Sequence, residues 1–156
     1  MFQFQVIAVS KPTGPWRELL ELYHERLIHL ARFQFTAIQP EKMGANVNRA
    51  QVIEREGERI IKALPKECVI IACDEQGKAY DSSQFVERLE HWSIQQTEPI
   101  VFVIGGPFGL SPAVTQVATS RLALAAWTLP HDLAVTVLLE QLYRACTIVT
   151  GKVYHY

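Results

Sequence analysis

Hydrophobic and polar positions follow two different periods along this chain, and the change of period predicts strands and helices in turn. Residues 2–9 begin with alternation and end in the apolar run Val6 to Val9, a pattern typical of a strand that becomes buried on both faces. Further short β-rich or apolar runs follow at residues 33–38, 68–73, 99–104 and 122–128. The pattern therefore predicts five extended segments.

Between these segments, apolar residues recur every three or four positions, which is the spacing of an amphipathic helix. Such helices are predicted over residues 16–30 and 52–64, from residue 81, from residues 111–112, and over residues 131–150. Asp81 and Gln84 have the spacing of a capping box, and Ser111 with Pro112 forms a typical helix start. The charges of the second helix, Glu56 among them, are interpreted as mostly a solvated face. The polar stretches 39–48 and 74–78 are interpreted as loops, the first of them flexible.

The last predicted helix is unusually apolar. Between Leu133 and Val149 its only strongly polar residues are Glu140, Gln141 and Arg144. Nearly its whole circumference should seek burial, and a small monomer can hardly cover such a surface. A twofold contact between identical chains is the commonest way to hide it, so the sequence predicts a homodimer built on this helix.

Alternating strands and helices predict an α/β fold, with a mostly parallel sheet flanked by helices. The 156 residues, 49% of them hydrophobic, suit a single domain spanning residues 1–156. No apolar stretch approaches the roughly 20 residues of a membrane span, and the N-terminus lacks a targeting pattern, so a cytoplasmic protein without membrane contact is expected. Cys68, Cys73 and Cys146 match no metal spacing and are expected to be free thiols, so no metal is assigned.

The net charge of −1 excludes the broad basic surface with which many proteins hold nucleic acid. Eleven of the fifteen Lys and Arg residues lie within residues 1–78. Any contact with phosphate is therefore expected to use the first half of the chain.

Ligands of parallel α/β sheets bind beyond the carboxyl ends of the strands. Three segments are predicted there: Cys73-Asp74, the glycine loop 105–110, and residues 127–131. The glycine loop alone is a weak signal, because a tight turn without a ligand is about as common and the dinucleotide spacing and phosphate-binding lysine are absent. His131 alone could equally cap its helix or be solvated, and Arg144 could be an exposed cation.

Read in order, the motifs carry more information than any one of them. They are Asp74 with Gly77, residues 102–110, 128–131 and 140–145, and finally Tyr154-His155. Together with residues 56–58 they resemble the large-subunit ribosomal RNA methyltransferase H family of the SPOUT class, over the whole chain. The resemblance implies a C-terminal trefoil knot over about residues 99–156. It also implies methyl transfer from S-adenosylmethionine to N3 of a pseudouridine in 23S rRNA, within the large subunit or the whole ribosome.

The resemblance also implies roles for individual residues. Those implied for cofactor binding are Cys73, Gly105, Leu124, Ala125, Ala126, Trp127, Thr128 and Leu129. The acceptor nitrogen loses a proton as it attacks, so a base or a charge-stabilising group must lie within hydrogen-bond reach. His155 and Tyr154 are the candidates, on a tail that folds over the pocket of its own or the partner subunit. Arg144 is expected to steady phosphate or the developing negative charge.

Four positions depart from the family pattern. Tyr156 and Val135 stand where the family often has cations, Cys73 where it has leucine, and Phe108 where it has a polar residue. Each lost cation would weaken RNA binding by about 1–3 kcal/mol if it made a charge-assisted contact.

Two other functions remain open. A non-catalytic ribosome-binding or assembly protein of the same fold is favoured by the lost cations. A nucleotide-handling enzyme on an ordinary doubly wound sheet is disfavoured, because neither a lysine nor a second acidic metal ligand accompanies the glycines.

Overall fold

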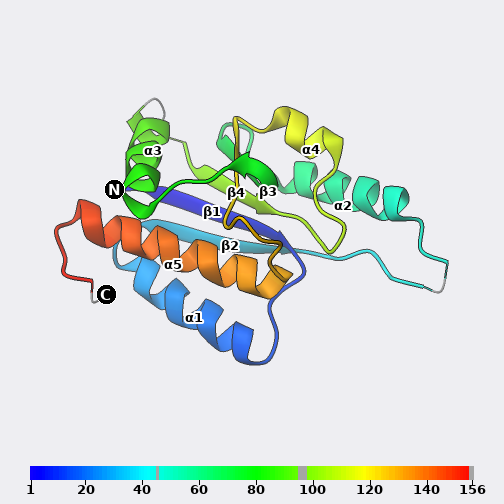
Figure 1. Ribbon diagram of the computed structural model, residues 1–156, viewed down its shortest axis with the longest axis horizontal. Coiled ribbons are helices and arrows are strands. Elements are labelled where there is room, and N and C mark those ends of the chain that lie inside the picture. The colour runs from blue at the N-terminus through cyan, green and yellow to red at the C-terminus, as the bar shows by residue number, and fades with distance from the viewer. Residues whose placement is uncertain (45, 95–97, 155–156) are drawn as a thin grey trace.

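The computed structural model describes residues 1–44, 46–94 and 98–154, which form one five-stranded sheet between two layers of helices (Figure 1). The strands are β1 (Gln3–Val9), β2 (Arg32–Ile38), β3 (Val69–Lys78), β4 (Ile100–Ile104) and β5 (Ser120–Leu122). Their order across the sheet is β2-β1-β4-β3-β5, and every pairing between them is parallel. The predicted fold class, a mostly parallel sheet flanked by helices, is confirmed.

The helices divide between the two faces of the sheet. They are α1 (Pro15–Ile28), α2 (Arg49–Ala63), α3 (Ser82–Ile94), α4 (Pro112–Val117) and α5 (His131–Val149). α1, α3 and α5 cover one face, and α2 and α4 cover the other (Figure 1). Within the described ranges, no helix is long and apolar enough to cross a membrane.

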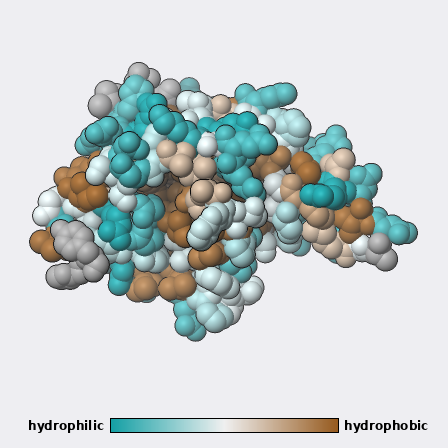
Figure 2. All heavy atoms as spheres, viewed as in Figure 1, coloured by the Kyte–Doolittle hydropathy of each residue, from teal (hydrophilic) through white to brown (hydrophobic). Residues whose placement is uncertain are grey.

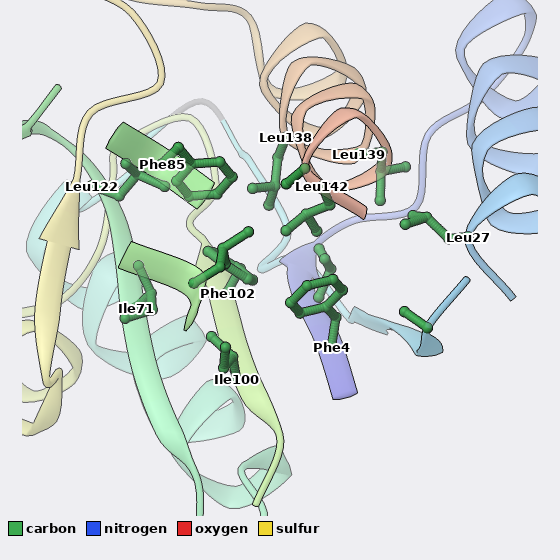
Figure 3. Packing of buried hydrophobic residues seen from close by; sticks show 14 of the residues in the cluster. Phe4, Leu27, Ile71, Phe85, Ile100, Phe102, Leu122, Leu138, Leu139 and Leu142 are labelled. Atoms are coloured by element: carbon green, nitrogen blue, oxygen red, sulfur yellow. The ribbon is translucent and has the colours of Figure 1, made fainter. Parts of the chain in front are cut away.

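The strand residues supply both cores by simple alternation. In β4, Ile100, Phe102 and Ile104 point into the larger core under α1, α3 and α5, whereas Val101 and Val103 point toward α2 and α4. Figure 3 shows Phe102 of β4 facing Phe85 of α3 and Leu138 and Leu142 of α5. A buried central strand needs apolar residues at every position, which explains the continuous run from residue 99 to 104.

The predicted helix ends are confirmed by their hydrogen bonds. Gln84 N–H donates to Asp81 Oδ1 at 2.8 Å, and Asp81 N–H donates to Gln84 Oε1 at 3.2 Å, which is a complete capping box. Val114 N–H donates to Ser111 Oγ at 3.3 Å at the start of α4. Gly151 ends α5 with a φ of +65°, a left-handed conformation that glycine adopts without strain.

α5 is more completely covered within one chain than its sequence suggests. It lies between α1 and α3 against the sheet, and seven of its nineteen residues are buried. The expectation that a monomer can hardly cover this helix is therefore wrong for most of its length. Ile148 and Val149 at its C-terminal end remain 49% and 45% exposed. The homodimer stays a prediction.

Two segment boundaries differ from those predicted. Residues 74–78 belong to β3, because Leu122 of β5 pairs with both Cys73 and Lys78 and the residues between them form an irregularity in the ladder. Conversely, the extended segment predicted over residues 122–128 is wrong: β5 covers Ser120–Leu122, and residues 123–130 have no regular structure. Pairing between segments far apart in the sequence decided both boundaries.

Candidate active site

The register of three neighbouring strands brings the three predicted ligand-binding segments to one edge of the sheet. Cys73 of β3 pairs with Ile104 of β4 on one side and with Leu122 of β5 on the other. Gly105 follows Ile104 directly, and the 124–129 segment begins two residues after Leu122. The three segments that hold the eight residues implied for cofactor binding therefore begin at one edge of the sheet, although these residues come from positions up to 56 residues apart in the chain.

The glycine loop after β4 is tightly folded on itself. Gly109 N–H donates to the Gly106 carbonyl at 3.0 Å, and Gly109 has a φ of +86°. A Cβ at position 105 would lie only 2.7 Å from the backbone carbon and oxygen of Gly109. Glycine at position 105 is thus required by the loop's own geometry, before any ligand is considered.

His131 joins the start of α5 to this loop. Its Nδ1 lies 3.1 Å from the Gly105 carbonyl oxygen, and its Nε2 is buried without a hydrogen-bond partner among the described residues. The two alternatives left open for His131, that it caps its helix or is solvated, are thereby excluded. A buried ring nitrogen without a partner, at the point where these segments meet, fits a site that receives a polar ligand atom.

The 124–129 segment presents an apolar surface beside the loop. Trp127 is 82% exposed, whereas Leu124 packs against the core. Thr128 Oγ1 donates to Glu75 Oε2 at 3.0 Å, which fastens this segment to the end of β3. An exposed indole next to a half-buried Leu129 offers the apolar walls that a planar ring ligand needs.

Cys73 contributes a neutral side chain to this edge. The residue is only partly buried, but its thiol is enclosed, and this burial raises the pKa of the thiol to about 12, with the Asp74 charge as a second cause. The thiol is therefore protonated at neutral pH and is not a nucleophile. Cys68 and Cys73 lie on opposite faces of the sheet, because Cys68 packs with the core under α2 and Cys73 with the other core.

Asp74 holds the neighbouring strands β3 and β5 together. It accepts a hydrogen bond and ion pair from Arg121 Nη2, whose guanidinium also donates to Gln76 Oε1 at 3.3 Å. Beside them, a Cβ at Gly77 would lie 2.6 Å from backbone atoms of Arg121 and Leu122. The role of Asp74 in this structure is to anchor β5, and Gly77 lets the two backbones touch.

Glu56 is an exception to the interpretation of the charges on α2 as mostly a solvated face. The residue is 2% exposed, its Oε1 accepts the Glu41 N–H at 3.0 Å, and its Oε2 has no partner among the described residues. A Cβ at Gly106 would lie 2.6 Å from this Oε2. The carboxylate thus packs directly beneath the glycine loop. In the sequence, only the 56–58 motif of the family resemblance indicated that Glu56 is important. The charge pattern of the helix indicated instead that Glu56 is solvated.

Replacing Glu56 with alanine is expected to lower the free energy of unfolding by about 2–4 kcal/mol, because a buried hydrogen bond is lost and a cavity opens under the glycine loop. Urea denaturation of the variant measures this loss. Glu56→Gln is the control, since it keeps the Oε1 acceptor and the side-chain volume. Equal stability of both variants and the parent protein would show that this contact does not support the loop.

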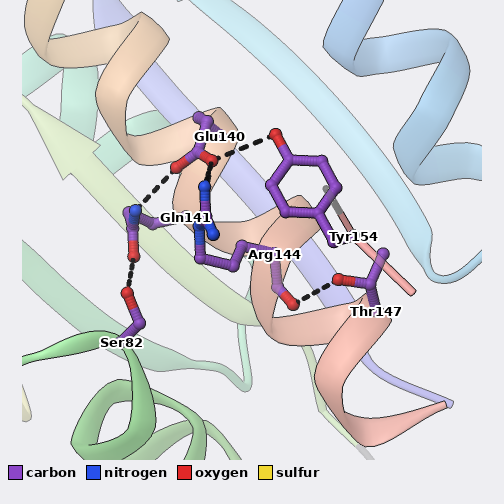
Figure 4. Close-up of polar contacts among 6 residues, drawn as sticks. All are labelled: Ser82, Glu140, Gln141, Arg144, Thr147 and Tyr154. Carbon is purple, nitrogen blue, oxygen red and sulfur yellow. Dashed lines mark hydrogen bonds and ion pairs between the residues drawn. The ribbon is translucent and has the colours of Figure 1, made fainter. Parts of the chain in front are cut away.

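The candidate catalytic residues Arg144 and Tyr154 lie elsewhere in the chain (Figure 4). Glu140 accepts hydrogen bonds from Arg144 Nη2 at 2.6 Å and from the Tyr154 hydroxyl at 3.1 Å, and the Arg144 guanidinium carbon lies 4.5 Å from the centroid of the Tyr154 ring. Thirteen residues of α5 separate Arg144 from His131, which corresponds to about 20 Å along the helix axis. One chain therefore does not bring these two side chains to its own glycine loop.

The surroundings of Tyr154 and Arg144 limit what each group can do. Burial raises the pKa of the Tyr154 hydroxyl, and hydrogen bonding with Tyr23 and Glu140 adds to the rise, so the phenol remains a donor at neutral pH. The hydrogen bond to Glu140 likewise raises the pKa of Arg144, which stays cationic and paired. His155, the remaining candidate base, lies outside the described residues.

Two departures from the family pattern have structural explanations. Val135 is fully buried in the core under α5. In this chain the side chain at position 135 packs in the core, so the absence of a cation there removes no charge from the surface. The ring of Phe108 lies under Arg49 of α2, with 4.7 Å between the guanidinium carbon and the ring centroid. This stacking ties the glycine loop to the start of α2.

Comparison with known proteins identifies the family. The family model described as predicted SPOUT methyltransferase matches residues 2–155. The chain belongs to the SPOUT methyltransferase family. It is 41% identical over 156 residues to "Ribosomal RNA large subunit methyltransferase H" of Xylella fastidiosa, covering 99% of this chain and 98% of that protein. The protein of the same name from Gemmatimonas aurantiaca is 47% identical over 115 residues, 74% of each chain.

A solved structure supports the fold independently. A probable rRNA-methyltransferase from Porphyromonas gingivalis superposes with a TM-score of 0.53 at 15% identity, covering 95% of this chain and 70% of that chain. The prediction of a SPOUT methyltransferase is thus confirmed, and the nucleotide-handling enzyme is excluded. Among the residues that the structure describes, no three His, Cys, Asp or Glu side chains are grouped to hold a metal ion. The absence of a metal stays a prediction.

Proposed function

We propose that this methyltransferase uses S-adenosylmethionine to methylate N3 of a pseudouridine in 23S rRNA, within the large subunit or the assembled ribosome. The observation that carries the proposal is the shared register of Cys73, Ile104 and Leu122, which gathers the cofactor segments at one sheet edge. The names of the relatives, rRNA large subunit methyltransferases at 41% and 47% identity, support the substrate class.

The residues at this edge suit the proposed cofactor. S-adenosylmethionine supplies a methyl group on a positively charged sulfur when it is bound. Backbone groups of Gly105 and residues 124–129 would hold its polar atoms, and Leu124, Trp127 and Leu129 would enclose its adenine and exclude water. The Nε2 of His131, which has no hydrogen-bond partner among the described residues, would add a polar contact in the same place. With the methyl group already activated, the protein's main task is to position the acceptor.

Proton removal from the acceptor is assigned to the tail. Tyr154 is a donor at neutral pH, so it would stabilise negative charge on the acceptor base, and His155 would accept the proton. Because Arg144 lies about 20 Å along α5 from the glycine loop and Tyr154 packs against Arg144, we propose that both act at the loop of a second chain. Figure 2 shows hydrophobic atoms around the C-terminal end of α5, where Ile148, Val149 and Val153 are exposed, and this surface suits a homodimer contact.

The proposal includes the organisation of the chain. Residues 1–156 would act as one cytoplasmic, metal-free domain whose knotted region covers about residues 99–156.

A non-catalytic ribosome-binding role is the second candidate. It is favoured by Tyr156, which replaces the basic residue that often ends the family's tail, and by the pairing of Arg144 with Glu140. Val135 no longer supports it, because that position is buried.

Transfer of a labelled methyl group to ribosomes that lack the modification tests the two functions directly. His155→Ala is expected to lower the transfer rate by about 10²–10⁴-fold, the usual contribution of a general base. Its affinity for S-adenosylmethionine, measured by calorimetry, should remain within about twofold.

Lys152→Ala, in the same tail but without an assigned role, is the control and should retain full activity. A fully active His155→Ala protein would remove His155 from the mechanism. No transfer by the parent protein, with normal ribosome binding, would favour the non-catalytic role.

A further inference from the structure

Two adjoining hollows lie beside α3, outside the proposed cofactor segments. The first, of about 410 Å³, is lined by Lys78, Tyr80, Gln84, Glu87, Arg88 and His91. The second, of about 310 Å³, lies between α3 and the starts of β3 and β5. Arg88 and His91 line both hollows, so we call the two together the α3 trough.

The α3 trough holds two cations that have no acidic partner. Among the described residues, neither Lys78 nor Arg88 forms an ion pair, whereas five arginines elsewhere do. Both cations lie near the ring of Tyr80: Lys78 Nζ is 5.1 Å and the Arg88 guanidinium carbon 5.9 Å from its centroid. Glu87 is the one carboxylate among the residues that line the trough. The lining therefore has an excess of positive charge around an aromatic face.

The trough adjoins the proposed active site through the backbone. The Lys78 carbonyl accepts the N–H of Ala123 at 3.1 Å, and the next residue, Leu124, begins the cofactor segment. From Gln84 to Trp92 the trough follows α3 for about 12 Å, given the rise of about 1.5 Å per residue. One end of a chain-like ligand lying there would be beside the cofactor segment, because Lys78 is at the carboxyl end of β3 and the second hollow is at the starts of β3 and β5.

We propose that the α3 trough binds the phosphodiester backbone of the RNA substrate, with Lys78 and Arg88 contacting phosphates beside Tyr80. RNA fits better than an acidic protein segment, because one end of the trough adjoins the segment proposed to bind the cofactor and the proposed methyl acceptor is RNA. This inference rests on the proposed RNA substrate. It also revises the expectation that phosphate contacts use only the first half of the chain, since Arg88 belongs to the second half.

The test measures binding without catalysis, so it is independent of methyl transfer. Lys78→Ala/Arg88→Ala protein is titrated onto ribosomes lacking the modification, in the absence of S-adenosylmethionine, at several salt concentrations. Loss of two contacts to unpaired RNA should weaken ribosome binding by about tenfold or more at low salt. A plot of the logarithm of the association constant against the logarithm of the salt concentration should become shallower, its slope falling in magnitude by about 1.4. Affinity for S-adenosylmethionine should be unchanged, because Lys78 supports the cofactor segment only through its backbone carbonyl.

Lys62→Ala/Lys66→Ala is the matched control, with the same change of charge at two exposed lysines on and after α2. It should bind within about twofold of the parent protein with an unchanged salt slope. A benzophenone amino acid in place of Arg88 should cross-link to rRNA on irradiation.

Binding of the Lys78→Ala/Arg88→Ala protein equal to that of the control would overturn the assignment of the trough, and so would cross-links to ribosomal protein alone. Either result would leave the proposed methyl transfer intact. Failure of the parent protein to methylate these ribosomes, with the expected loss of binding in the double variant, would instead contradict the proposed function.

Discussion

Replacing Gly77 with alanine is expected to destabilise the protein by about 3 kcal/mol or more, or to prevent folding. A Cβ there would lie 2.6 Å from three backbone atoms, the carbon of Arg121 and the nitrogen and carbon of Leu122. Backbone atoms cannot rotate away as a side chain can, so β3 and β5 would have to separate. Separation would also break the Asp74–Arg121 pair and the hydrogen bond from Ala123 to Lys78.

Urea denaturation followed by circular dichroism measures the effect. Gly44→Ala is the control, because a Cβ at position 44 would meet no atom within 4 Å. A loss below about 1 kcal/mol for Gly77→Ala, no larger than that of the control, would show that the two strands do not meet as closely as the structure has them.

Gly105→Ala is expected to weaken S-adenosylmethionine binding by about 10- to 100-fold, because overpacking costs about 1–3 kcal/mol and each 1.4 kcal/mol is a factor of ten in affinity. The added Cβ would lie 2.7 Å from the Gly109 backbone and 3.0 Å from the Leu110 nitrogen. The loop would have to open, which would also displace the carbonyl that faces His131. Gly105→Val should abolish binding altogether, since its larger side chain would add a clash with the cofactor.

Calorimetry of cofactor binding and a thermal melt separate loss of the site from loss of the fold. Both Gly105 variants should still melt cooperatively, with the core residues Phe102 and Ile104 unchanged in their packing. Unchanged cofactor affinity in Gly105→Ala would count against the glycine loop as part of the pocket.

The sequence was informative wherever a local pattern decides the structure. The continuous apolar run at residues 99–104 predicted a strand buried on both faces, and the spacing of Asp81 and Gln84 predicted a capping box that forms as expected. The order of the motifs predicted the family that the comparisons show. These features depend on backbone geometry within a few residues, so the local sequence determines them.

The failures all involve contacts between distant segments. Residues 74–78 have loop composition, yet they belong to β3, and Lys78 pairs with Leu122 of β5 more than forty residues later. Glu56 sits among charges on α2, yet the glycine loop covers it. The sequence shows that α5 is apolar on nearly every side, but only the sheet order reveals that α1 and α3 cover most of it.

The amino-acid sequence by itself determined the α/β class, the positions of most helices and strands, the family, and the set of segments that would meet a cofactor. Only the tertiary structure decided that Arg144 and Tyr154 lie far along α5 from the glycine loop of their own chain, and that Lys78 and Arg88 share one trough. The physical reason is that periodicity and turn chemistry act over a few residues. The neighbours of a side chain across the molecule depend instead on strand order and helix packing, which the whole chain settles together.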